Sequence, residues 1–91
     1  MHYDMVAVGR RIKKLRLERK LTQEQLAELL HISVSMMSQV ERGVRGISMD
    51  ALIVLTEEFP VSIDYIIKGK EISIDQVREK LNTLVAELVK L

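Results

Sequence analysis

Chain-breaking residues are scarce and widely spaced in this sequence, which restricts its fold more than any other feature. Proline occurs once in 91 residues, at Pro60, and the four glycines lie at positions 9, 43, 46 and 69. Between them, apolar residues recur every three or four positions, the period of a helix that is buried along one side. We expect the glycines to punctuate these helices. The sequence therefore predicts an all-α fold.

Five short helices are predicted before residue 70, with residue types typical of helix ends at most boundaries. They are expected at about 6–20, from Thr22 to near Leu30, from after Ser33 to Gly43, from after Ser48 to Pro60, and at 62–68. Thr22 and Gln25 match a capping box, Ser33 is typical of an N-cap, and Gly43 of a residue that ends a helix. The residues expected on the apolar stripes are Val8, Ile12 and Leu15 with Arg19 beside them, Leu26, Leu29 and Leu30, Met37 and Val40, Leu52, Ile53, Leu55 and Phe59, and Ile63, Ile66 and Ile67.

The last segment, residues 73–91, has a different pattern. Its apolar residues are spaced alternately by three and four positions, as in the a/d seam of a coiled coil: Ile74, Val77, Leu81, Leu84, Leu88 and Leu91. An isolated helix of this length is marginal in water, so the stripe must pack on something. It could pack on its own domain or pair with a second subunit.

Composition excludes several classes of function. The chain has no cysteine, which excludes disulfides and cysteine-ligated metals and fits a cytoplasmic protein. Its longest apolar run, residues 51–55, is too short to cross a membrane. The two histidines, His2 and His31, and the lack of a phosphate-binding glycine loop leave no set of residues for catalysis. We therefore expect no enzymatic activity, cofactor or metal site, and aromatic residues (3%) are too few for RNA stacking.

Charge is unevenly distributed along the chain. Residues 1–50 contain nine Lys or Arg and six Asp or Glu, a net charge of +3, whereas residues 51–91 contain five and seven, a net charge of −2. The basic half has room for a phosphate-facing patch. The cluster at residues 10–20 could equally be a solvated helix face.

The second and third predicted helices are joined by a very short turn, residues 30–32. Small Ala27 allows the two helices to cross closely, and the apolar residues around it fix the crossing and leave the outer face of the third helix free. This spacing is typical of a helix-turn-helix, whose second helix enters a DNA major groove. A plain αα-hairpin in a helical bundle would have the same spacing.

Several segments resemble the Xre/Cro-like family of phage-repressor DNA-binding domains. They are LTQEQLA at 21–27, IS at 32–33 and SQVERG at 38–43, and VSIDYIIKG at 61–69 resembles the end of the family's fifth helix. The resemblance covers roughly residues 6–69. It implies a five-helix helix-turn-helix domain, residues 1–70, that binds operator double-stranded DNA, usually as a two-fold dimer. A C-terminal amphipathic helix, residues 71–91, lies outside it.

The resemblance also implies roles for individual residues. Val34, Ser35 and Gln39 match positions that face base edges, Thr22, Gln23, Arg42 and Arg45 match or adjoin positions that face the DNA backbone, and Arg16 and Glu41 match an internal ion pair. Chemistry agrees, since glutamine can contact adenine through two hydrogen bonds and valine can contact a thymine methyl. The alternatives are that Val34 is buried and that Gln39 is only solvated.

The sequence departs from the family's pattern in three respects. His31 occupies a turn position where glycine is usual, and Pro60 replaces a usual glycine. The short side chains of Val34 and Ser35 suggest that recognition depends partly on DNA shape.

The expected function is a sequence-specific transcriptional regulator, a repressor, that inserts its third helix into the major groove as a homodimer. Because operators have two half-sites, we expect the C-terminal seam to form the dimer interface. An antiparallel pairing would bring Lys80 opposite Glu87. The alternative is an antitoxin-like module whose C-terminal helix binds a protein partner.

Overall fold

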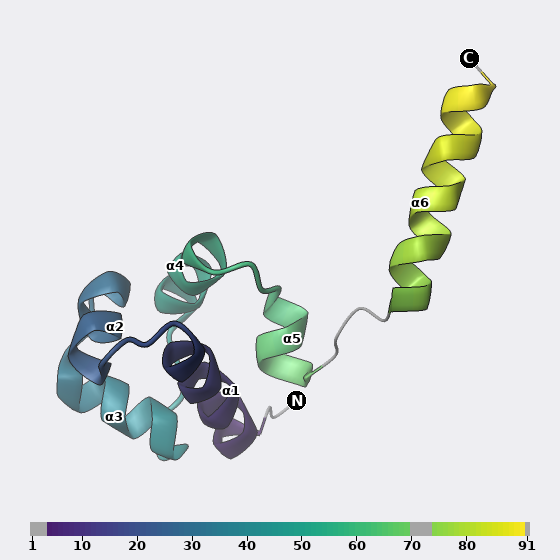
Figure 1. Ribbon diagram of the computed structural model, residues 1–91. Coiled ribbons are helices and arrows are strands. Elements are labelled where there is room, and N and C mark those ends of the chain that lie inside the picture. Colours follow the sequence, from purple (N-terminus) through teal and green to yellow (C-terminus); the bar gives the residue numbers. More distant parts are fainter. Residues whose placement is uncertain (1–3, 70–73, 91) are drawn as a thin grey trace.

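The computed structural model describes residues 4–69 and 74–90, and over these ranges all regular secondary structure is α-helical (Figure 1). The helices are α1 (Met5–Glu18), α2 (Gln23–Leu30), α3 (Val34–Arg42), α4 (Met49–Glu58), α5 (Ile63–Lys68) and α6 (Ile74–Val89). The predicted fold class, five helices followed by a C-terminal helix, is confirmed.

Short polar side chains begin the first five helices. The N-cap residues Asp4, Thr22, Ser33, Ser48 and Ser62 each accept a hydrogen bond from a backbone N–H of the first turn. The capping box predicted at α2 is complete, because Gln25 Oε1 also accepts from the Thr22 N–H at 2.8 Å. Four of these starts were evident from the sequence, because a cap depends on residues within one turn of each other.

The limits of α1 differ from the prediction. The helix begins at Met5, after Asp4, and ends at Glu18 rather than Lys20. Lys20 adopts a left-handed backbone (φ 57°), and the Leu21 N–H donates to the Arg16 carbonyl at 3.0 Å. This tight reversal returns the chain to the core, where Leu21 packs against the buried cluster.

One hydrophobic core holds α1 to α5 together. Its residues are Val8, Ile12, Leu15, Leu26, Ala27, Leu30, Met37, Val40, Ala51, Leu52, Leu55, Phe59 and Ile66. Two residues predicted to face inward are exposed instead, Ile53 at 42% and Ile63 at 43%. The core side of α4 includes the small residue Ala51, which the predicted apolar stripe did not contain. Arg19 is also exposed, and its guanidinium stacks 5.2 Å from the centre of the Phe59 ring.

Gly9 lies inside α1 and is buried, so the prediction that it punctuates a helix is wrong. A methyl group at this position would overlap the Val40 carbonyl oxygen and lie 2.8 Å from that of Glu41. Gly9 therefore allows α1 to approach the last turn of α3 closely. The sequence around Gly9 could not reveal this contact, because Val40 and Glu41 lie about 30 residues further along the chain.

In Figure 1, α6 stands clear of the other five helices. Every side chain from Val77 to Lys90 is exposed, and the exposed fraction rises from 43% at Val77 to 68% at Leu88. The side chain of Ile74, and all of Leu91, lie outside the described residues. None of the described helices is long and apolar enough to cross a membrane.

Candidate nucleic-acid interface

The joint between α2 and α3 is fixed by backbone geometry at the turn. His31 ends α2 in a left-handed conformation (φ 58°, ψ 40°), which a non-glycine residue rarely adopts. The Ile32 N–H then donates to the Ala27 carbonyl at 3.0 Å, and Ser33 caps α3 at the Met36 N–H. The turn geometry usual for glycine is thus kept with histidine in its place.

A buried ion pair connects α1 to α3, as the resemblance implied. Arg16 donates through Nε to Glu41 Oε2 at 2.7 Å and through Nη2 to Glu41 Oε1 at 3.0 Å. The exposed fractions of the two side chains are 10% and 2%. Arg16 Nη1 also donates to the Leu21 carbonyl at 2.9 Å, so all three guanidinium nitrogens are used. This two-point contact sets the angle at which α3 is held.

Gln23 joins the same network from the first turn of α2. Its Nε2 donates to Glu41 Oε1 at 3.0 Å, while its side-chain oxygen has no hydrogen bond within the described residues. Glu41 therefore connects three helices. The contact was not predicted, because nothing local to either residue shows that they meet.

The two sides of α3 have opposite character. Met37, Val40 and Glu41 are buried. On the other side Val34 is 42% exposed and Ser35 is exposed, so the alternative of a buried Val34 is wrong. Gln39 is half-buried at the edge of this surface. The core thus positions α3 while its predicted base-facing residues remain accessible.

Arg42 and Arg45 lie exposed at the C-terminal end of α3. The Arg45 guanidinium is 3.5 Å from Gln39 Oε1, and the Val44 N–H donates to the Gln39 carbonyl. The short loop therefore keeps Arg45 beside Gln39.

At the other end of α3, a shallow hollow of about 430 Å³ separates Val34 from the start of α2, where Thr22 is exposed. The hollow is lined by Arg16, Lys20, Leu21, Thr22, Gln23, Glu24 and Val34.

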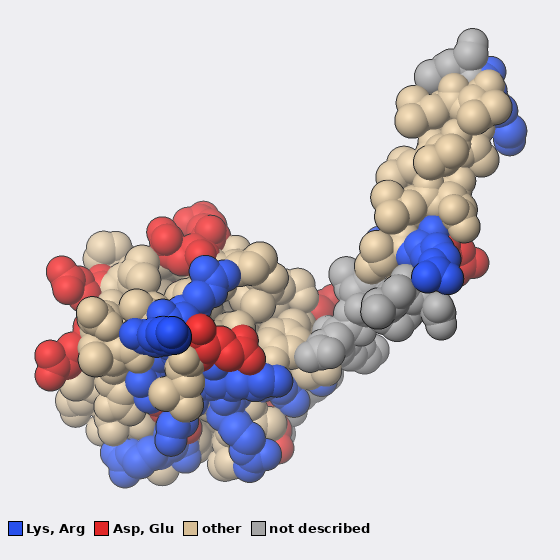
Figure 2. All heavy atoms as spheres, viewed as in Figure 1, with Lys and Arg blue, Asp and Glu red and all other residues tan. Residues whose placement is uncertain are grey.

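Charge is unevenly distributed over the face of the five-helix unit that Figure 2 shows. Figure 2 shows Lys and Arg gathered along the lower edge of the view, over α1 and the C-terminal end of α3, whereas Asp and Glu lie over α2 and α4. On the face seen in Figure 2 the lower edge is therefore the most basic part, and it contains the end of α3.

A family model described as helix-turn-helix matches residues 12–66, which include α2, α3 and most of the core. The chain belongs to the Xre/Cro-like helix-turn-helix family. The matched region ends within α5 and does not include α6.

Relatives of known name are transcriptional regulators. The chain is 41% identical over 63 residues to the HTH-type transcriptional regulator PrpR of Mycobacterium tuberculosis, covering 69% of this chain and 13% of PrpR. It is 31% identical over 85 residues to ImmR of Bacillus subtilis, covering 93% of this chain and 67% of ImmR. It is 35% identical over 78 residues to the immunity repressor of Bacillus phage phi105, covering 86% of this chain and 54% of that repressor.

A solved structure with the same fold is the P22 c2 repressor in complex with a synthetic operator. The superposition has a TM-score of 0.65 at 30% identity and covers 69% of this chain and 96% of the repressor chain. The fold shared with a phage repressor is therefore confirmed by both sequence and structure.

Proposed function

We propose that this protein is a sequence-specific DNA-binding transcriptional regulator that represses promoters by inserting α3 into the major groove. The observation that carries the proposal is the two-sided character of α3. Its buried side is locked to α1 and α2 through Glu41, and its opposite side exposes side chains that have no part in the core. The P22 c2 repressor in complex with its operator, and the phage phi105 immunity repressor, support this reading.

Each residue of the proposed interface has a role that suits its chemistry. Gln39 would contact an adenine, Val34 a thymine methyl, and Ser35 either a base or a phosphate. Thr22 and Gln23 at the start of α2, Arg42 in the last turn of α3 and Arg45 in the loop after it would contact the DNA backbone and set the register of the complex. Because Val34 and Ser35 are short, part of the sequence preference would come from DNA shape.

We further propose that the protein acts as a homodimer, in which residues 1–70 bind DNA and residues 71–91 associate. The seam of Ile74, Val77, Leu81, Leu84, Leu88 and Leu91 would form the interface. Exposure of Val77, Leu81, Leu84 and Leu88 in the single chain supports this, since such a stripe needs a partner. A dimer would place two copies of α3 on half-sites about one helical turn, or roughly ten base pairs, apart.

Selection of bound duplexes from a random DNA pool tests the proposal. We expect enrichment of a two-fold symmetric motif with half-sites about ten base pairs apart. Gln39→Ala should relax the preference at one base pair in each half-site and cost about 1–3 kcal/mol there. Asn82→Ala, which removes an exposed amide from α6, is the matched control and should leave the motif unchanged.

A second candidate function is a protein-interaction module, and the exposed apolar stripe of α6 is the observation in its favour. In that case no motif would be enriched, and the little DNA binding present would vanish at modest salt. The full chain would also remain monomeric on its own, because α6 would be reserved for a different protein.

A further inference from the structure

The packing of α1 places Lys13 beside the last turn of α3. Gly9 faces the carbonyl oxygens of Val40 and Glu41, and Arg16 binds the Glu41 carboxylate. Lys13 lies four residues after Gly9 and three before Arg16, and residues at these spacings share one side of a helix. The side chain of Lys13 therefore emerges along the border between α1 and the end of α3.

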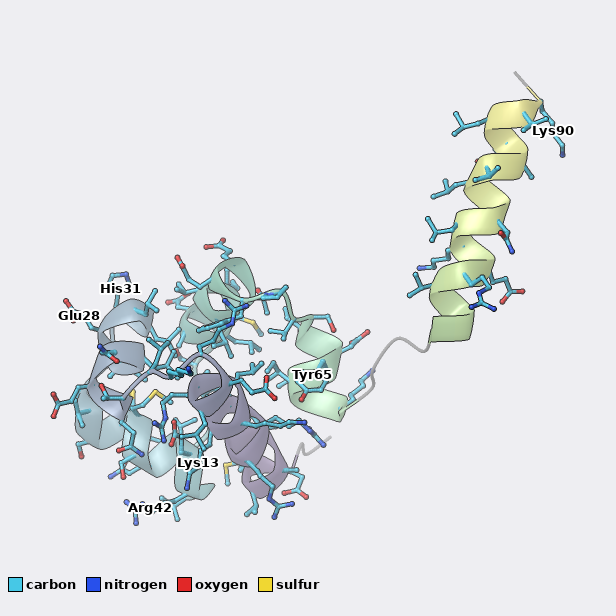
Figure 3. The ribbon with its side chains drawn as sticks, in the orientation of Figure 1. Lys13, Glu28, His31, Arg42, Tyr65 and Lys90 are labelled. Atoms are coloured by element: carbon cyan, nitrogen blue, oxygen red, sulfur yellow. The ribbon has the colours of Figure 1, made fainter. Side chains whose placement is uncertain are left out.

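Lys13 is exposed, and no ion pair among the described residues neutralises its charge. In the ranges 4–69 and 74–90 the ion pair present is Arg16–Glu41, in which Lys13 has no part. In Figure 3 Lys13 of α1 and Arg42 of α3 project from the same lower edge of the molecule. Figure 2 shows this edge to be basic.

Three other cationic side chains in or next to α1 make contacts elsewhere. Arg11 Nη1 donates to the Ile66 and Ile67 carbonyls at 2.9 and 3.3 Å, so this arginine holds the end of α5. Arg16 is buried in the ion pair with Glu41 and Arg19 stacks on Phe59. The fold therefore gives three basic residues of the 10–20 cluster separate contacts, while Arg10, Lys14 and Lys20 are exposed, as Lys13 is.

We propose that Lys13 is a further DNA-contacting residue, which binds a backbone phosphate next to the one that Arg42 contacts. The inference rests on the proposed function. A lysine ammonium on a flexible stem is suited to a phosphate as a point charge. Because Lys13 lies on α1, outside the helix proposed for the groove, it adds affinity without reading sequence.

The experiment compares Lys13→Gln with the wild type in the full chain, on two probes across a range of salt concentrations. One probe is the duplex selected by the wild-type protein, and the other is a random-sequence duplex of equal length. We expect about fivefold weaker binding to both probes, and a slope of log affinity against log salt that is smaller by about 0.9. Lys13→Arg keeps the charge and should keep both the affinity and the slope.

Lys68→Gln is the matched control. It removes the same charge from an exposed lysine at the end of α5. The residue of α1 that bonds to α5 is Arg11, not Lys13. Thermal unfolding of each variant shows whether the fold is intact.

The possible outcomes separate the inference from the proposed function. If the wild type selects a motif but Lys13→Gln and Lys68→Gln bind alike, the role of Lys13 is wrong and the proposed function stands. A changed base preference in Lys13→Gln would also overturn it, because a phosphate contact has no sequence preference. If the wild type selects no motif, the proposed function fails, and the inference fails with it.

Discussion

The five-helix unit and α6 are equally helical but differ in where their apolar side chains lie. In α1 to α5 the stripes converge on one core, and Ile12, Leu26, Met37, Leu55 and Ile66 are fully buried. In α6 the regularly spaced leucines of a heptad seam are all exposed, at 56–68%. A strong amphipathic pattern therefore shows that a helix needs a partner, but it does not show whether the same chain supplies that partner.

The two regions are also stabilised differently. The five shorter helices are capped by side chains and crossed by hydrogen bonds between helices, such as the network around Glu41. From Val77 to Val89, α6 makes no such hydrogen bond to the described residues of the other five helices. Burying one leucine side chain is worth about 1.5–3 kcal/mol, so association of α6 would contribute much of its stability.

The largest effect is expected from Glu41→Ala, which tests whether the five-helix unit depends on its internal network. The change leaves Arg16 buried without its carboxylate and should lower the free energy of unfolding by about 3–5 kcal/mol. Urea denaturation measures this. Glu28→Ala removes an exposed glutamate from α2 and should change stability by no more than about 0.5 kcal/mol. A similar small change for Glu41→Ala would show that the ion pair contributes little.

The next largest effect is expected in α6. Leu81→Glu combined with Leu84→Glu places charges in the proposed seam and should weaken self-association by at least about 100-fold, or 2.7 kcal/mol. Sedimentation equilibrium measures the association. The five-helix unit should unfold at an unchanged midpoint in conditions where both proteins are monomeric. Glu79→Gln, outside the seam, is the control. Unchanged association in the double variant would move the dimer interface away from α6.

Gly9→Ala tests the close contact between α1 and α3. Helix propensity alone would predict a gain of about 1 kcal/mol. Overlap with the Val40 carbonyl should instead lower stability by about 1–3 kcal/mol. Lys14→Ala, at an exposed position of the same helix, should be nearly neutral. Thermal unfolding of both variants decides, and a more stable Gly9→Ala protein would mean that the helices separate at little cost.

The smallest effect sharpens the account of α6. If two copies pair antiparallel, Lys80 of each faces Glu87 of the other. Lys80→Glu should then weaken the dimer by about 0.5 kcal/mol for each contact, and the swap Lys80→Glu with Glu87→Lys should restore it. Sedimentation in low salt is the suitable measurement, since screening reduces surface ion pairs. A swap that fails to restore association would contradict the antiparallel arrangement.

Prediction from the sequence succeeded where structure is local. The starts of α2 to α5 depend on Thr22, Ser33, Ser48 and Ser62, each of which bonds to a backbone group within its own helix. It failed where a residue's role depends on a distant segment. The placement of Gly9 against Val40 is the clearest case, because neither residue has a local signal for the other.

The candidate site follows the same division. The family resemblance was sufficient to name Val34, Ser35 and Gln39, and the structure shows that α3 leaves this side accessible. The resemblance did not show that Gln23 bonds to Glu41, or that Lys13 emerges beside the end of α3. These are contacts between helices, which depend on how the helices are packed.

The sequence by itself determined that this chain is helical, where most of its helices begin and end, and to which family it belongs. The physical reason is that capping and periodicity involve residues within about four positions of one another. Only the tertiary structure decided which basic residues of α1 are buried, which hold a neighbouring helix and which remain free. The position of each basic side chain depends on how the helices cross. At Gly9, for example, the absence of a methyl group permits α1 to approach α3.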